Sequence, residues 1–136
     1  MDLPTYLRKK NKILNDILNV TLIPEDQIVD LPITTSMVKI MLQYIAKYRH
    51  GVYNKGEVYL NEKICPYCAM YVHIYDCEGC PMHKANNCCH DRGSTFKMIL
   101  RKINYHTDIE TRTDIQLKLV KLAEEFVKAN KGLLND

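Results

Sequence analysis

All six cysteines of this 136-residue chain lie within one short segment, between Cys65 and Cys89. Residues 64–92 show little hydrophobic periodicity and few aliphatic side chains, so this segment needs a cross-link to hold a defined structure. The N-terminus lacks the unbroken apolar run of a secretory signal, and clustered cysteines in a protein that stays inside the cell favour metal or redox chemistry over a disulfide framework. The chain is therefore expected to fold around the chemistry of its own cysteines.

The spacing of these cysteines is typical of a zinc site. Two Cys-x-x-Cys pairs follow one another, Cys65 with Cys68 and Cys77 with Cys80. Two thiolates on a tight turn point at one ion, and two such turns supply the four soft ligands of a tetrahedral zinc site. We therefore predict that Zn²⁺ is bound by Cys65, Cys68, Cys77 and Cys80.

The same segment holds more potential ligands than one tetrahedral ion uses, so the ligand set stays open. Four residues are alternates that could replace one of the predicted ligands, most readily Cys77: Cys88, Cys89, His83 and His90. An iron–sulfur cluster is the alternative cofactor, because cysteine-rich loops with a Cys-Pro step also hold such clusters. A zinc ion with a complete thiolate shell has no position left for water, which predicts a structural rather than a catalytic metal.

The sequence Cys65-Pro-Tyr-Cys68 also resembles the active-site dithiol of glutaredoxins. In that family the motif follows the first strand of a βαβ unit, whereas here two helical segments precede it and Cys77 and Cys80 follow closely. We therefore expect that the protein is not an enzyme. A thiol–disulfide oxidoreductase is the main enzymatic alternative, with Cys65 as the nucleophile and Cys68 as the resolving thiol.

Hydrophobic residues recur at helical spacing on both sides of the cysteine segment. With Thr34, Ser94 and Asp108 near the starts and Gly51 and Gly132 near the ends, the pattern predicts helices over residues 4–20, 34–51, 94–106 and 108–132, and a short strand at 57–60. This indicates a mainly α fold, a small bundle of about four helices with a cysteine-rich zinc-binding insert. We expect a single domain over residues 1–136, helical in 1–51 and 93–136, with the insert at 52–92.

The net charge of the chain is only a weak indication of a nucleic-acid partner, but two short segments carry clustered basic residues. The net charge of +3 is mild, and the basic residues are spread along the chain. Basic side chains near the N-terminus and just after the insert could contact phosphates, and tyrosines of the insert could stack on bases if they face solvent. The candidate nucleic-acid-binding residues are Arg8, Lys9, Lys10, Tyr67, Tyr71, Lys97 and Arg101.

The apolar segments of the chain are short. Lysine, arginine or glutamine interrupts each of them well before the roughly 20 apolar residues that span a bilayer. We therefore expect no membrane insertion and a cytoplasmic protein, located in the host-cell cytoplasm if the chain is viral.

Residues 65–96 carry a recognisable order of motifs, with CPYC, then CEGCP, then a further cysteine, and then Gly-Ser-Thr and an aromatic residue that open a helix. This order resembles small, cysteine-rich, zinc-finger-like proteins encoded in bacteriophage genomes. The resemblance implies a small accessory or regulatory protein that binds a host or phage macromolecule. We therefore expect a zinc-stabilised binding module whose partner is nucleic acid or a host or phage protein, with inhibition of a host enzyme or defence system as the alternative.

Overall fold

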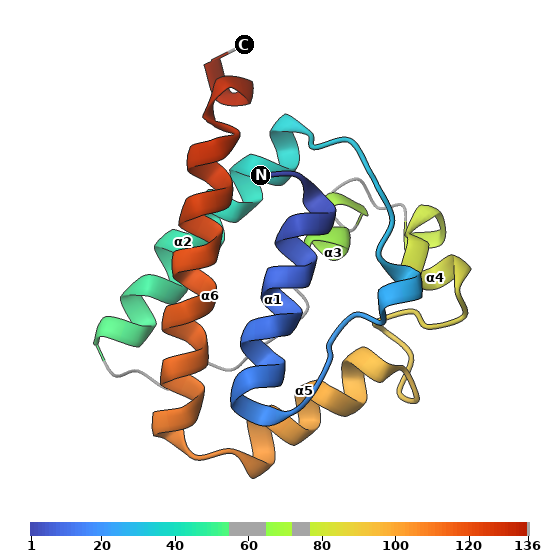
Figure 1. The fold of residues 1–136 in the computed structure, drawn as a ribbon, viewed down its shortest axis with the longest axis vertical. Helices are drawn as coiled ribbons and strands as arrows, with labels where there is room; N and C mark the ends of the chain where they lie inside the picture. The colour runs from blue at the N-terminus through green and yellow to red at the C-terminus, as the bar shows by residue number, and fades with distance from the viewer. Residues whose placement is uncertain (55–64, 72–76, 136) are drawn as a thin grey trace.

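The computed structural model describes residues 1–54, 65–71 and 77–135, and six α-helices lie in these ranges (Figure 1). The four long helices are α1 (Leu3–Leu18), α2 (Thr35–Tyr53), α5 (Thr95–His106) and α6 (Ile109–Ala129). The shorter elements are α3 (Pro66–Tyr71), α4 (Pro81–Lys84) and the 3₁₀ turns η1 (Glu25–Gln27), η3 (Cys77–Gly79) and η4 (Lys131–Asn135). The mainly helical prediction is confirmed, but the described ranges hold six α-helices instead of about four, because the insert contributes two. The strand predicted at residues 57–60 lies outside the described residues.

Each long helix begins after a side chain that accepts a hydrogen bond from a backbone N–H of the first turn, which satisfies one of the donors left unpaired there. These capping residues are Asp2, Thr34, Ser94 and Asp108. The helix ends follow the prediction less closely. Helix α2 passes Gly51 and continues to Tyr53, because Val52 is 5% exposed and packs into the core. Helix α6 ends at Ala129, before the predicted stop at Gly132.

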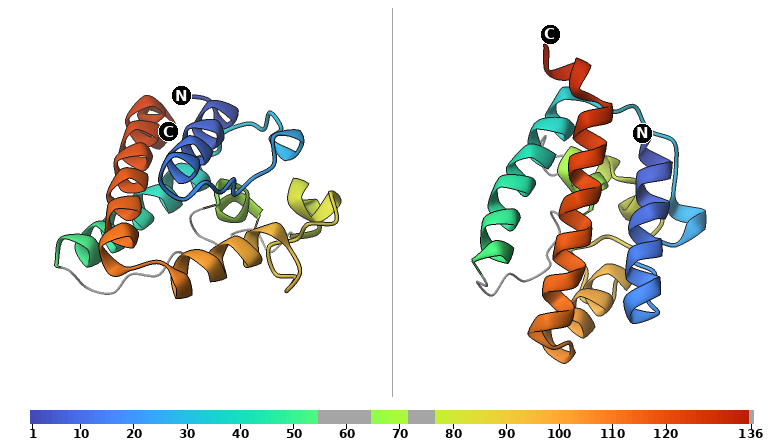
Figure 2. Two further views of the ribbon diagram at one scale, coloured as in Figure 1. Left: turned by 60° about the horizontal axis from the view of Figure 1, so that its bottom comes forward. Right: turned by 60° about the vertical axis from the view of Figure 1, so that its left-hand side comes forward.

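The long helices form the body of the protein. Helix α6 packs against both α1 and α2, and α5 runs across the end of the body where it joins α6 (Figures 1 and 2). The ring of Tyr6 meets the ring of Phe126 edge-on at 4.9 Å between centroids, and the Tyr44 hydroxyl donates a hydrogen bond of 3.3 Å to Gln116. No described helix is both long enough and apolar enough to span a membrane.

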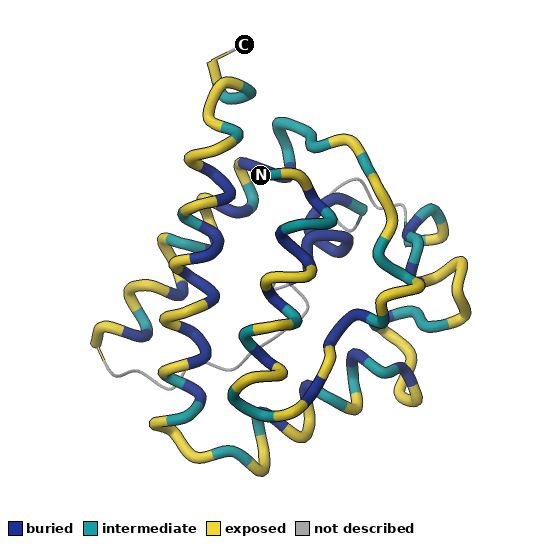
Figure 3. The backbone as a smooth tube through the Cα atoms, in the orientation of Figure 1, coloured by how far each residue is buried: buried dark blue, intermediate teal, exposed yellow. Residues whose placement is uncertain are grey.

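The insert is part of the core instead of an appendage. Helix α3 packs against α2 and lies beside α1, and it is buried over nearly its whole length (Figures 2 and 3). Tyr67 is fully buried, and its hydroxyl accepts a hydrogen bond of 2.9 Å from the Val29 N–H and donates one of 3.1 Å to the Gln27 carbonyl. Asn87 also contacts Gln27, and its side-chain oxygen accepts a hydrogen bond from the N–H of Thr95 at the start of α5. These contacts join the α1–α2 connection, α3 and the start of α5 around the cysteines.

Candidate metal centre

Burial divides the six cysteines into two groups. Cys65, Cys68, Cys80 and Cys89 are between 2% and 7% exposed, whereas Cys77 and Cys88 are half-buried. None of the six is in a disulfide. A buried thiol with no structural role is a small apolar side chain, but four of them from three separate turns in one core indicate shared chemistry.

Three potential ligands already converge. The sulfur atoms of Cys68 and Cys89 lie 3.1 Å apart, and a ring nitrogen of His90 lies within 4.8 Å of both. The two sulfurs are too far apart for a disulfide bond of about 2.05 Å. Two thiolates on a tetrahedral zinc ion with Zn–S bonds of about 2.3 Å lie about 3.8 Å apart, so these two sulfurs would separate by about 0.7 Å to share an ion. This group could therefore hold a metal ion.

The remaining ligand candidates surround this group. One small pocket is lined by Cys68, Tyr71, Cys77, Cys80, His83, Cys88, Cys89 and His90. Cys65 does not line this pocket. Cys65 is buried, and its charge raises the pKa values of Cys68 and Cys80. The eight candidates from the sequence therefore gather in one region, although they come from four different segments.

Two Cys-Pro steps build similar local environments at the start of α3 and of α4. In each, proline occupies the first position of the helix, where its missing N–H costs no hydrogen bond. The backbone N–H groups of Tyr67 and Cys68 lie close enough to the Cys65 sulfur to lower its pKa, and those of Met82 and His83 do the same for Cys80. Backbone N–H groups at a helix start favour an anion, so both turns favour the thiolate that a metal requires.

Burial works against these thiolates while no cation balances them. Burial raises the pKa of Cys80 to about 11 and also raises the pKa of Cys65. The pKa of Cys68 is raised most strongly, first by its hydrogen bond with Cys89 and then by burial. At neutral pH such groups are thiols, and a metal ion that binds them must displace their protons.

The predicted ligands are only partly the residues that the fold buries together. Cys65, Cys68 and Cys80 are in the buried group, whereas Cys77 is half-buried on η3. Cys89, an alternate in the sequence prediction, is buried beside Cys68 instead. No sequence signal separates Cys88 from Cys89, because adjacent residues of one loop differ only in which side the folded chain turns inward.

The predicted nucleic-acid-binding residues separate into buried and exposed ones. Tyr67 is fully buried and Lys10 is 1% exposed, so neither is available for the predicted contact with nucleic acid, and Tyr71 is half-buried at the metal pocket. The burial of Lys10 has a sequence signal that the prediction missed, because this residue follows Leu3 and Leu7 at helical spacing.

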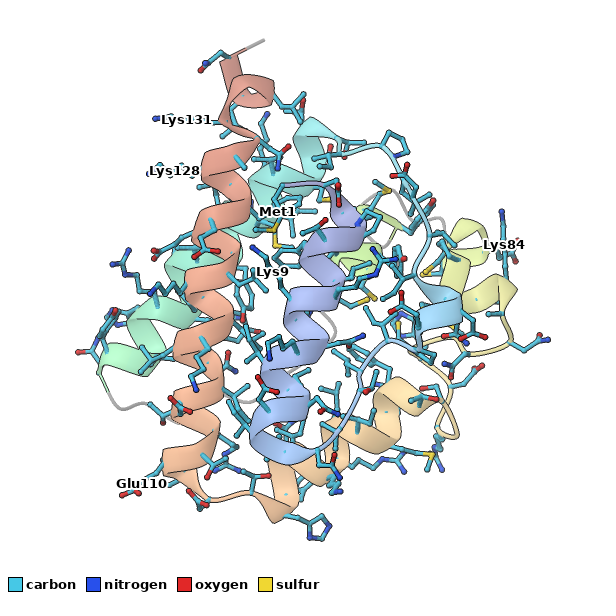
Figure 4. All side chains as sticks on the ribbon, in the orientation of Figure 1. Met1, Lys9, Lys84, Glu110, Lys128 and Lys131 are labelled. Carbon is cyan, nitrogen blue, oxygen red and sulfur yellow. The ribbon has the colours of Figure 1, made fainter. Side chains whose placement is uncertain are left out.

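Four basic candidates remain at or near the surface. Arg8 is exposed and forms an ion pair of 2.8 Å with Glu25, and Lys9 is exposed on α1 (Figure 4). On α5, Arg101 is exposed and Lys97 is half-buried. On α1, the neighbouring Glu25 offsets the charge of Arg8.

No protein-family model, characterised protein or solved structure matches the chain.

Proposed function

We propose that this protein is a zinc-stabilised binding module in which Cys65, Cys68, Cys80 and Cys89 hold one Zn²⁺ ion. The observation that carries the proposal is the burial of four thiols from three turns of the insert, two of which, Cys68 and Cys89, are in contact. Four thiolates match the soft, tetrahedral coordination that zinc takes in structural sites. His90 is exposed at the rim of the group, so it is the less favoured fourth ligand.

The same observations favour a structural metal over thiol–disulfide exchange. A nucleophilic cysteine has a lowered pKa and an accessible sulfur. Cys65 is 2% exposed, and burial raises the pKa of its thiol. A reagent or disulfide substrate has no direct approach to such a sulfur in the folded protein.

Purified protein, prepared under reducing conditions, is expected to contain about one zinc per chain, because the buried thiols suffice for one tetrahedral shell. Elemental mass spectrometry against protein concentration gives this ratio directly. Cobalt substitution gives a second readout, because thiolate-to-cobalt charge-transfer absorption reports sulfur ligands. A metal-free protein that keeps its helical spectrum would contradict the proposal, and iron with visible absorption would favour the iron–sulfur alternative.

The partner that the surface favours is nucleic acid, bound through α5. Residues 92–107 hold four of the chain's 19 lysines and arginines and none of its 16 aspartates and glutamates, so the net charge of +3 comes from this segment. Arg101 and Lys102 are exposed, and the exposed side chains of Met98 and Tyr105 flank them on the same face of the helix. A basic helix face with an aromatic side chain suits contact with phosphates and bases.

Charge reversal on α5 tests this partner. Arg101→Glu with Lys102→Glu is expected to weaken binding to labelled mixed-sequence DNA at least about tenfold at low salt and to reduce the dependence of log K on log salt by roughly 1 to 2. Fluorescence anisotropy across a salt series measures both quantities. Lys128→Glu with Lys131→Glu is the matched control, because both residues are exposed near the C-terminal end of α6, far from α5 (Figure 4). Equal losses in the two double variants, or a flat salt response, would contradict the nucleic-acid proposal and favour a protein partner.

A further inference from the structure

Lys10 occupies a core position on α1. It continues the inward stripe of Leu3, Leu7 and Leu14, and its side chain is 1% exposed. Its Nζ atom is inaccessible to solvent and has no hydrogen-bond partner among the described residues. An ammonium group in this situation is costly unless a negative charge lies nearby, so the position calls for a partner.

The groups whose charges act on Lys10 are the cysteines of the centre. Burial lowers the pKa of Lys10 to about 8, and Cys65 and Cys68 oppose that shift. Burial raises the pKa of Tyr6, one helical turn earlier on α1, and Cys65 raises it further. Helix α1 runs close to α3, the helix that begins directly after Cys65 (Figures 1 and 2).

We propose that Lys10 is the internal counter-charge of the metal centre, so that its ammonium group stabilises the metal-bound thiolates and raises the affinity for zinc. This inference rests on the proposed zinc site. Four thiolates around one Zn²⁺ ion carry a net charge of −2 in a buried place, and a neighbouring ammonium reduces the total to −1. Without metal, the Nζ atom of Lys10 is enclosed and has no hydrogen-bond partner among the described residues, so nothing offsets its burial.

This arrangement links metal loading to the packing of α1. The zinc-bound centre gains the attraction of Lys10, while the metal-free protein keeps an uncompensated cation in its core. A lysine retained only for packing would instead place its amino group in solvent, since its aliphatic stem reaches far enough for that in most core-edge positions. The enclosed Nζ atom therefore favours an electrostatic role.

Replacement of Lys10 by methionine separates charge from packing, because methionine is unbranched and of similar length. Lys10→Met is expected to weaken Zn²⁺ binding roughly 10–100-fold, the usual effect of removing a group that supports metal ligands. The metal-free variant should be at least as stable as the metal-free wild type, because a buried unpaired charge is gone. Zinc affinity is measured on the full chain by competition with a chromophoric chelator, and metal-free stability by urea unfolding.

Three further variants test whether the charge of Lys10 causes the change in zinc affinity. Lys9→Met removes an exposed lysine from the neighbouring position of α1 and should leave zinc affinity unchanged. Lys10→Gln supplies a second neutral side chain should the methionine variant fold poorly, and Lys10→Arg keeps the charge and should retain more affinity than either. Wild-type affinity in both neutral variants, or equal losses in Lys10→Arg and Lys10→Met, would overturn the role of Lys10 while the zinc site stands. If the wild-type protein binds no zinc, that result would instead contradict the proposed function itself.

Discussion

Replacement of Cys89 by serine is expected to abolish stoichiometric zinc binding, whereas the same change at the adjacent Cys88 should preserve it. The reason is that Cys89 is 7% exposed with its sulfur 3.1 Å from that of Cys68, while Cys88 is half-buried. Structural zinc contributes an apparent binding free energy of about 10–16 kcal/mol in small zinc domains at neutral pH, so loss of one thiolate of four removes a large part of it. Zinc content by elemental mass spectrometry, with chelator competition for affinity, measures both variants.

The same test can be made with serine variants of Cys77 and Cys80, the second Cys-x-x-Cys pair. Cys80→Ser should lose zinc as Cys89→Ser does, and Cys77→Ser should retain it, because Cys77 is half-buried on η3. His90→Ala distinguishes a four-thiolate site from one with three thiolates and a histidine. Zinc loss from Cys77→Ser together with retention in Cys89→Ser would contradict the proposed ligands and restore the set that spacing alone favours.

Removal of zinc by a chelator under reducing conditions is expected to unfold the insert and leave a weakened helical body. Helix α6 packs against α1 and α2, and none of these three helices contains a cysteine, so part of the helical circular dichroism should remain. Helix α3, with 6 residues, and α4, with 4, are too short to be stable alone. Once they unfold, the hydrogen bonds of the Tyr67 hydroxyl to the Val29 N–H and the Gln27 carbonyl are lost as well.

Amide hydrogen exchange locates this change along the chain. Chelation should remove protection from residues 65–71 and 77–92 and from Val29, while α2 and α6 keep most of theirs. Re-addition of zinc should restore the original pattern, which separates metal removal from damage to the protein. Unchanged exchange after verified zinc removal would show that the insert folds without metal and would contradict a structural role for the ion.

The helices and the segment that holds the candidate metal ligands follow from local sequence. Asp2, Thr34, Ser94 and Asp108 cap the long helices, because a cap needs only a polar side chain next to the first free backbone N–H groups. Two closely spaced Cys-x-x-Cys pairs similarly predict a metal-binding segment, since two cysteines separated by two residues on a turn need no distant partner to converge. Ends of helices were less predictable, as at Gly51, where burial of Val52 extends α2.

Two features depend on contacts between segments that are distant in the chain. They are which cysteines lie together and which groups surround Lys10. The contact between Cys68 and Cys89 joins residues 21 positions apart in the chain, which no local pattern encodes. Lys10 lies in a basic run of sequence, although its helical spacing from Leu3 and Leu7 indicates burial. Which groups surround its buried side chain depends on how α1 packs against the rest of the core. Local sequence thus determined the helices and the cysteine-rich segment. Tertiary packing decided which thiols meet and which charge they face, because burial is a property of the assembled core and not of any one segment.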